Sequence, residues 1–273
     1  MSAIQLEIIM ASYHFSVKTG KRGSATNHAA YIAREGKHGK DDKINDLVAV
    51  QHGNLPDWAN GDPKAFWRAA DENERVNGAA YREFEVALPS ELTKEQNIAL
   101  VQEFIKKEVG NKPVHFAIHA PTAALGGVEQ LHAHIMTSDR VPDGISRSPE
   151  QHFKRHNRDK PELGGCRKDS GGKDKGVLKA ELVSRRKCWA DLENDHLTKH
   201  GFTAQVDHRS NRARGIEAKP ERHLGQACIL KMSEDEKTNF QAERKLKKVV
   251  LVRDKPIIEK LEPAQPGASA NPT

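Results

Sequence analysis

Two short stretches in which apolar residues alternate with histidines constrain this fold more than any other feature. Residues 114–119 read VHFAIH and residues 131–135 read LHAHI. Alternation with period two is typical of half-buried β-strands, and the glycines at 126 and 127 suit a hairpin connection. If the two strands pair, one face of the hairpin carries the imidazoles of His119, His132 and His134.

Three imidazoles on one face predict a site for a divalent metal ion. Neutral imidazole binds borderline metals, and three protein ligands leave coordination positions open for a substrate. The alternative interpretation is ordinary surface histidines, since the chain contains 14 of them. A third histidine on the facing strand favours the metal site over that alternative.

Composition bounds the class of protein and its partner. The 273 residues include 44 Lys and Arg against 38 Asp and Glu, and this net charge of +6 favours a polyanionic partner. Three widely spaced cysteines fit reduced thiols in a cytoplasmic protein better than a disulfide framework. No apolar run approaches the roughly 20 residues of a membrane span, and no signal peptide is visible. We interpret residues 1–9 as a dispensable extension, with Met10 as an alternative start.

Periodicity elsewhere predicts a mixed α/β fold of the α+β type. Strands are expected over residues 12–18 and 81–88. Helices are expected from an N-cap at Ser24 to about Gly36, after the capping-box sequence at 93–96, and over residues 177–200. A central antiparallel sheet would then carry polar residues on one face and helices on the other.

Three further segments are assigned from their composition. Residues 154–176 are basic and rich in glycine, which indicates a mobile loop. Residues 202–209 have the pattern of a last short strand. Residues 231–273 are highly charged and end in a proline-containing stretch, which indicates a partly helical extension followed by disorder. The folded domain is therefore expected at residues 10–230.

The three tyrosines differ in their expected surroundings. Tyr13 lies on the apolar face of its strand, and Tyr81 begins its strand on the polar face. Tyr31 lies on the polar side of the helix expected over 24–36, beside Arg34. Tyr31 is therefore the candidate nucleophile, with an ordinary amphipathic tyrosine as the alternative.

A tyrosine motif and a three-histidine motif occur together with several shorter motifs. They are residues 30–37 (AYIAREGK), 67–71 (WRAAD), 84–89 (FEVALP), 117–120 (AIHA), 131–134 (LHAH), 153–157 (FKRHN), 207–209 (DHR) and 223–225 (HLG). Over about residues 10–230 this order resembles the MobA/MobL family of plasmid relaxases, which are histidine–hydrophobe–histidine nucleases. One departure is Gln130-Leu131, where family members often carry Asn-Pro, and altered loop geometry is the expected consequence.

The resemblance implies a five-stranded antiparallel sheet flanked by helices and a strand-specific nick at a plasmid transfer origin. It implies that Tyr31 attacks the DNA, leaving a 5′-phosphotyrosyl bond and a free 3′-hydroxyl, and that His119, His132 and His134 hold Mg²⁺ or Mn²⁺. Accessory mobilisation proteins and the coupling protein of a secretion system are the implied partners. The bacterial cytoplasm is the implied location, with transfer alongside the DNA strand as a further expectation.

Glu83 and Glu85 share a strand face that we expect to look toward the histidines. A carboxylate that accepts a hydrogen bond from a ligand histidine fixes the tautomer of that histidine. We favour Glu85, the more central of the two, for this role. A solvated strand face that carries two glutamates is the alternative.

Single-stranded or locally melted DNA is the expected substrate, because a tyrosine on a helix reaches one phosphate only from the side. Contacts to this DNA are expected from basic segments. The candidates are Lys18, Lys21, Arg22, Arg34, Lys154 and Arg155. Two other functions remain open: a rolling-circle replication initiator, and a non-catalytic origin-binding protein with structural histidines. Metal-dependent nicking distinguishes the last from the others, and the type of origin distinguishes the first two.

Overall fold

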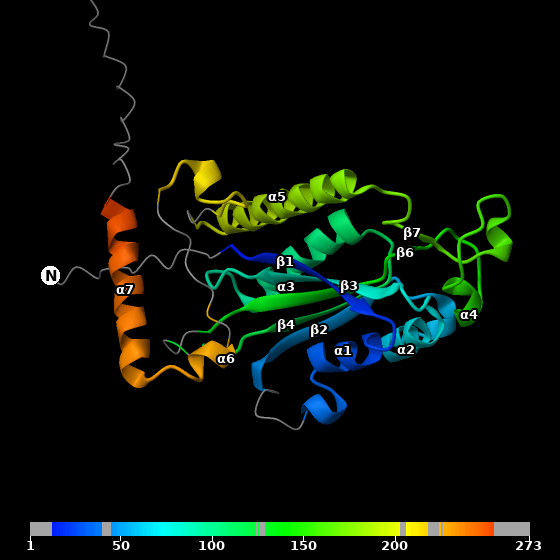
Figure 1. Ribbon diagram of the computed structural model, residues 1–273, viewed down its shortest axis with the longest axis horizontal. Helices are drawn as coiled ribbons and strands as arrows, with labels where there is room; N and C mark the ends of the chain where they lie inside the picture. Colours follow the sequence, from blue (N-terminus) through cyan, green and yellow to red (C-terminus); the bar gives the residue numbers. More distant parts are fainter. Residues whose placement is uncertain are drawn as a thin grey trace, which may run out of the picture. The chain divides into compact units, whose positions relative to one another are not determined.

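The computed structural model describes residues 13–39, 45–123, 125, 129–202, 206–217, 224 and 226–253 (Figure 1). Residue contacts divide the chain into two compact units, Met1–Ala123 with Gly127–Glu221, and Ala124–Gly126 with Arg222–Thr273. The second unit contributes α6 (Gln226–Ile229) and α7 (Glu234–Arg253). The other elements named below belong to the first unit. The glycines at 126 and 127, the first and last residues of the motif at 223–225 and the predicted extension at 1–9 lie outside the described residues.

A five-stranded antiparallel sheet forms the centre of the first unit, which confirms the predicted fold class. Its strands are β1 (Phe15–Lys21), β2 (Leu47–Gly53), β3 (Ala79–Ala87), β4 (Val114–His119) and β5 (His132–Thr137). Their order is β1-β3-β5-β4-β2, so the two histidine strands are neighbours inside the sheet. The part of residues 202–209 that the structure describes forms no strand, so that prediction is wrong there.

One face of the sheet packs against α3 (Lys94–Phe104), its π-helical continuation η4 (Ile105–Val109) and α5 (Lys175–Lys199) (Figure 1). The predicted capping box is present: Thr93 accepts from the Gln96 backbone, and Gln96 accepts from the Thr93 backbone. Trp189, Leu192 and Leu197 of α5 are fully buried. This face is the larger apolar core, and both predicted helices are confirmed.

The other face packs against α1 (Ala25–Ile32) and α2 (Pro63–Asn73). Ala25 and Ala29 are small, so α1 lies close to the sheet beside Ala117 of β4. Ala117 is the sheet neighbour of His134, so these helices share the face that carries the histidines. The prediction of helices only on the opposite face is therefore wrong, because α1 and α2 partly cover the face that carries the histidines.

The first turn of α1 is capped by a residue from another helix. Ser24 occupies the N-cap position, but its hydroxyl donates to the Lys21 carbonyl. The Asp71 carboxylate of α2 accepts instead from the backbone N–H groups of Ala25 and Thr26, both at 2.8 Å. This carboxylate also suits the positive end of the helix dipole. The predicted capping position is right, but the capping side chain comes from α2.

Residues 154–176 are anchored by buried arginines, so the prediction of a mobile loop is wrong. Arg140 donates hydrogen bonds to the carbonyls of Lys154 and Cys166 at 2.7 and 2.8 Å. Arg147 donates to the Gly164 carbonyl at 2.9 Å. These donors satisfy backbone groups that a glycine-rich segment cannot pair by itself. The elements of this region are β6 (Arg140–Val141), α4 (Pro149–His152), η5 (Pro161–Leu163) and β7 (Arg167–Lys168), with β6 paired to β7.

Short 3-10 helices also occur among the described residues of the first unit. They are η1 (Gly36–Gly39), η3 (Asp57–Ala59) and η6 (Arg212–Arg214). Among the helices in the described ranges, none combines the length and the apolar character needed to cross a bilayer.

Candidate active site

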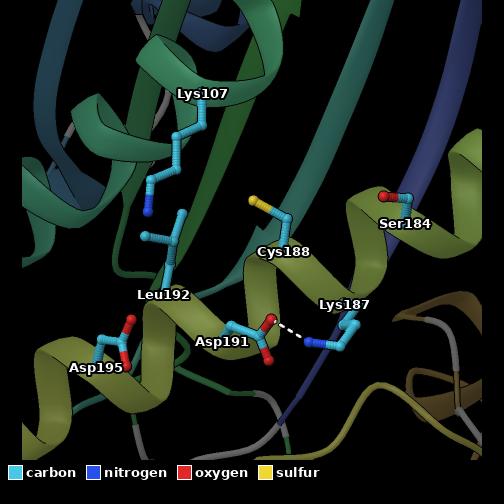
Figure 2. A pocket seen from close by; sticks show the side chains of 7 residues that line it. All are labelled: Lys107, Ser184, Lys187, Cys188, Asp191, Leu192 and Asp195. Atoms are coloured by element: carbon cyan, nitrogen blue, oxygen red, sulfur yellow. Dashed lines mark hydrogen bonds and ion pairs between the residues drawn. The ribbon is translucent and has the colours of Figure 1, made fainter.

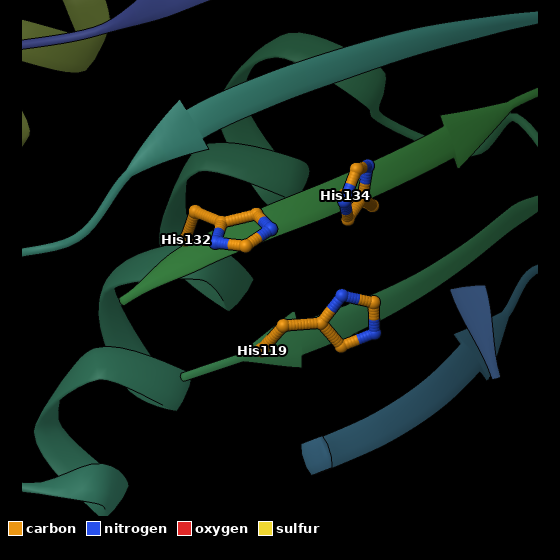
Figure 3. Close-up of side chains that lie close together, drawn as sticks. All are labelled: His119, His132 and His134. Atoms are coloured by element: carbon orange, nitrogen blue, oxygen red, sulfur yellow. The ribbon is translucent and has the colours of Figure 1, made fainter. Parts of the chain in front are cut away.

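Three imidazoles meet where β4 and β5 run side by side (Figure 3). His119 lies opposite His132 in the sheet register, and His134 follows two residues later on the same face. The ring centroids are 5.0 to 5.5 Å apart, and one nitrogen of each ring lies within 4.8 Å of the others. The predicted convergence of the three histidines is confirmed.

Each imidazole has one nitrogen bound to an acceptor of the protein. The pairs are His132 Nδ1 with the Gln130 carbonyl at 2.8 Å, His134 Nδ1 with Glu83 Oε1 at 2.7 Å, and His119 Nε2 with the Ile32 carbonyl at 2.7 Å. Carbonyl and carboxylate oxygens only accept, so each of these nitrogens carries the proton. The second nitrogen of each ring then carries a lone pair, as a metal ligand requires, and that of His119 Nδ1 faces Arg34 Nη2 at 3.3 Å.

Burial keeps two of these rings neutral. It lowers the pKa of His119 to about 4, against the opposing hydrogen bond to the Ile32 carbonyl and with the help of the Arg34 charge. Burial also lowers the pKa of His132, against the opposing hydrogen bond to the Gln130 carbonyl. Metal binding needs deprotonated ligands, so this donor set fits a borderline divalent ion.

Glu83 is the carboxylate that holds His134, so the preference for Glu85 in this role is wrong. Glu83 is 2% exposed, and its Oε1 accepts from His134 Nδ1 at 2.7 Å and from His28 Nε2 at 2.8 Å. Burial alone would raise the pKa of Glu83, but these two hydrogen bonds outweigh it and hold the pKa at about 2. Glu83 is therefore ionised at neutral pH.

Glu85 is engaged by Lys18 of β1 instead. The sheet register places Glu85 directly opposite His134, and Lys18 directly opposite Glu83. Both observed contacts are thus diagonal, from Lys18 to Glu85 and from His134 to Glu83. Direct and diagonal neighbours are both within reach of long side chains, so the strand pattern alone could not choose between the two glutamates.

Tyr31 lies beside the histidines, and the residue is 36% exposed. Its ring centroid is 6.4 Å from that of His134, and the Arg34 guanidinium carbon is 5.0 Å from the Tyr31 centroid. His28 stacks against the Tyr31 ring at 6.0 Å, and His38 meets it edge-on at 5.5 Å. An accessible phenol thus stands next to the three imidazoles.

The other two tyrosines are occupied structurally. Tyr81 is buried and stacks on His28 at 4.8 Å. A Cβ at Gly20 would lie only 1.8 Å from Cε1 of Tyr81, so this position of β1 requires glycine. The Tyr13 hydroxyl donates to the Arg186 carbonyl at 2.9 Å. Tyr31 is therefore the one tyrosine of the chain that faces both solvent and the histidines.

Two of the arginines expected to contact DNA are occupied within the protein. Arg34 is 7% exposed and forms an ion pair with Asp46, which contradicts a role as a surface contact. Arg22 donates to the backbone carbonyls of Asp71 and Glu72 at the end of α2.

The remaining basic candidates are exposed. Lys18 and Lys21 lie on β1, and Lys154 and Arg155 follow α4. Arg140, just past the end of β5, binds the Lys154 carbonyl. His132 begins β5, and six residues of strand span about 17 Å. Lys154 and Arg155 are therefore anchored at the opposite end of β5 from His132.

His28 and Asp46 are site residues that the sequence did not reveal. His28 stands three positions before Tyr31 on α1, and this helical spacing was an available signal. Asp46 precedes β2 without any motif, and only the tertiary fold brings it to Arg34.

A surface pocket lies on the other side of the sheet, between η4 and α5 (Figure 2). Its lining residues are Lys107, Ser184, Lys187, Cys188, Asp191, Leu192 and Asp195. Lys187 and Asp191 form an ion pair at 2.5 Å. Since α5 covers the face opposite the histidines, this pocket is separate from the candidate site.

Comparison with known proteins agrees with this geometry. Residues 24–234 match the model of the MobA/MobL family. A 43 kDa relaxation protein from Salmonella typhimurium is 50% identical over 209 residues, covering 76% of this chain and 56% of the relative. Mobilization protein A from Escherichia coli is 42% identical over 221 residues, covering 79% of this chain and 30% of the relative. The chain thus spans about half of the first relative and under a third of the second.

One solved structure supports the fold. It is described as the molecular basis of vancomycin resistance transfer in Staphylococcus aureus and matches with a TM-score of 0.53 at 24% identity. The match covers 73% of this chain and 100% of the other. It shows that the two chains share a fold.

Proposed function

The chain belongs to the MobA/MobL family, and from this premise we propose that it is a DNA relaxase that nicks one strand at a plasmid transfer origin. The observation that carries the proposal is the exposed Tyr31 ring, 6.4 Å from the ring of His134 in a three-imidazole cluster. The names of the matched relatives, a relaxation protein and a mobilization protein, support the same activity.

Tyr31 is the proposed nucleophile. Its phenolic oxygen attacks the scissile phosphorus, the bond from phosphorus to the 3′-oxygen breaks, and the phenol proton ends on the released 3′-hydroxyl. The product is a 5′-phosphotyrosyl bond. One phosphodiester replaces another, so the reverse attack by a 3′-hydroxyl can rejoin the strand.

His119, His132 and His134 are the proposed ligands of Mg²⁺ or Mn²⁺. A bound ion supplies positive charge to the non-bridging phosphate oxygens and orients the phosphate. Nitrogen ligands alone favour zinc and other late metals, so we assign the choice of ion to cellular availability and to phosphate oxygens that complete the shell. Glu83 fixes the tautomer of His134, and the Gln130 carbonyl fixes that of His132.

The proposed substrate is single-stranded or locally melted origin DNA. A stacked duplex would keep its phosphates away from a tyrosine that approaches from the side. Lys18 lies opposite Glu83 on β1 and contacts Glu85, so it is the proposed phosphate contact nearest the histidines. Lys21, opposite Ala79 at the other end of β3, would contact a part of the DNA farther from them. Lys154 and Arg155 would contact a more distant part of the strand. Accessory mobilisation proteins and a coupling protein are the proposed partners in the bacterial cytoplasm.

The test is incubation of the full chain with supercoiled plasmids that carry candidate transfer or replication origins, with Mn²⁺ or Mg²⁺ and with chelator as control. Denaturing gels should show nicked plasmid and a covalent protein–DNA adduct only with a transfer origin and a metal ion. An adduct only at replication origins would identify a replication initiator. Binding without nicking at any origin would contradict the proposed activity.

A further inference from the structure

Arg34 has a backbone conformation that residues other than glycine rarely adopt. Its φ is 53°, in the left-handed region, immediately after the C-cap residue Ala33 of α1. The whole residue is only 7% exposed. A strained backbone and a buried guanidinium persist only where surrounding contacts stabilise them. The contacts of Arg34 therefore indicate its role.

The Asp46 carboxylate binds the Arg34 guanidinium through two hydrogen bonds. Arg34 Nε donates to Asp46 Oδ1 at 3.0 Å, and Nη2 donates to Oδ2 at 2.8 Å. This two-bond geometry is specific to arginine, because a lysine ammonium cannot reproduce the planar fork. Asp46 directly precedes Leu47 of β2, which pairs with His119 in the sheet. The anchor is thus fixed to the strand next to the histidines.

The same guanidinium holds the proposed nucleophile. Its Nη1 donates to the Tyr31 carbonyl at 3.1 Å, and its carbon lies 5.0 Å from the centre of the Tyr31 ring. The first contact fixes the last turn of α1, and the second is a cation–π contact with the ring itself. Arg34 therefore restrains both the backbone and the side chain of Tyr31.

Arg34 also reaches the histidine cluster. Its Nη2 lies 3.3 Å from His119 Nδ1. Since His119 Nε2 donates to the Ile32 carbonyl, Nδ1 holds the only lone pair of that ring. This lone pair serves either the hydrogen bond from Arg34 or a metal ion, but not both. Arg34 and an ion thus compete for one atom.

We propose that Arg34 is a positioning residue that couples metal binding at His119 to the placement of Tyr31, and that it is not a DNA contact. The proposal rests on the proposed function of Tyr31 and the histidines. An ion on His119 Nδ1 would displace the hydrogen bond from Arg34 Nη2. The guanidinium would then be held by Asp46 and the Tyr31 carbonyl alone, so the ion and the position of Tyr31 would be linked through Arg34.

The test is Arg34→Lys in the full chain, with Arg68→Lys on the exposed side of α2 as the matched control. Lysine keeps the charge and loses the fork. Calorimetry should show Mn²⁺ binding tightened about threefold or more, because the guanidinium Nη2 that competes for His119 Nδ1 is gone. Single-turnover adduct formation at saturating Mn²⁺ and oligonucleotide should slow about tenfold or more. Oligonucleotide affinity should stay within about twofold of the unaltered chain, and Arg68→Lys should change none of the three.

Unchanged or weaker Mn²⁺ binding in Arg34→Lys would overturn the proposal. Weaker DNA binding with an unchanged adduct rate would instead make Arg34 a DNA contact. If Arg34→Lys does not fold, Asp46→Asn provides the opposite test: it frees the guanidinium for His119, so Mn²⁺ binding should weaken, and tighter binding would contradict the proposal. The calorimetric measurements need no nicking, so they remain decisive even if no origin is cut.

Discussion

The two faces of the central sheet are built from the same strands but buried in different ways. Beneath α3 and α5, Phe84 and Phe116 face an apolar layer that contains Trp189. On the other face, Glu83 and His119 are just as deeply buried, but each is held by hydrogen bonds. Burial of apolar groups needs only close packing, whereas burial of polar groups needs a partner for each.

This difference separates stability from chemistry within one sheet. Packing on the apolar face does not fix the direction of individual contacts, because dispersion attraction has no preferred direction. The hydrogen bonds on the polar face fix the tautomer and orientation of each ring. We therefore expect changes in the apolar face to act on folding, and changes in the polar face to act on metal binding and strand cleavage.

The largest expected effect on stability is that of Phe104→Ala in α3. Phe104 is fully buried, with ring centroids of Phe15, Phe84 and Trp189 at 5.9, 5.7 and 5.3 Å. Losing such a ring costs about 3–5 kcal/mol of unfolding free energy. Urea denaturation should show this loss, while the adduct rate per folded molecule stays unchanged. A loss below about 1 kcal/mol of unfolding free energy would contradict the claim that packing on the apolar face stabilises the fold.

Glu83→Gln should act on metal binding more than on folding. The amide lacks the charge that holds His134 Nδ1 and His28 Nε2. Loss of such a partner typically weakens metal affinity by about 10- to 100-fold. Calorimetry with Mn²⁺ measures the change, and Glu72→Gln on the exposed side of α2 is the control. Equal affinities in the two variants would contradict the role given to Glu83.

Glu193 sharpens the comparison, because it is a buried carboxylate on the apolar side. Burial raises the pKa of Glu193 to about 8, with the Glu91 charge adding and Trp189 opposing, whereas hydrogen bonds hold the pKa of Glu83 at about 2. The folded chain keeps a proton on Glu193 that the unfolded chain loses above about pH 4.5. Its contribution to stability is therefore present below that pH and is lost as the pH rises toward 8.

Glu193→Gln should remove this pH dependence. The variant should melt a few degrees higher than the unaltered chain at pH 8 and show a smaller difference at pH 5. Thermal unfolding at several pH values measures it. A difference that is the same at all pH values would contradict the buried, protonated state.

The smallest expected effect is that of Lys21→Ala on DNA affinity. One phosphate contact contributes about −0.7 to the log–log salt slope on single strands. The slope for an origin oligonucleotide should therefore become shallower by about that amount, as fluorescence anisotropy at several salt concentrations would show. Lys106→Ala on η4, an exposed lysine on the other side of the sheet, should leave the slope unchanged. Equal salt slopes for both variants would show that Lys21 does not contact a phosphate of the DNA.

What the sequence predicted correctly depends on neighbours along the chain. Period-two alternation identified the strands and the face shared by His119, His132 and His134, and the capping box at Thr93 identified the start of α3. The errors concern contacts between distant segments. Asp71 caps α1 across 45 or more positions, and a pattern within α1 carries no trace of it.

The same reason explains the misassigned polar residues. Arg34 resembled a surface cation beside a tyrosine, and only the fold brings Asp46 to its guanidinium. Residues 154–176 resembled a free loop, because the arginines that bind their carbonyls lie outside the segment. Buried charge pairs are thus the part of this fold that local patterns predict least well.

Tyr31→Phe tests the central claim most directly, by denaturing gel analysis of covalent adducts on a single-stranded transfer-origin oligonucleotide with Mn²⁺. Phenylalanine keeps the ring beside His134 and Arg34 and removes only the hydroxyl. The account predicts unchanged oligonucleotide binding and no adduct, with Tyr81→Phe still forming it. An adduct formed by Tyr31→Phe at the rate of the unaltered chain would contradict the account.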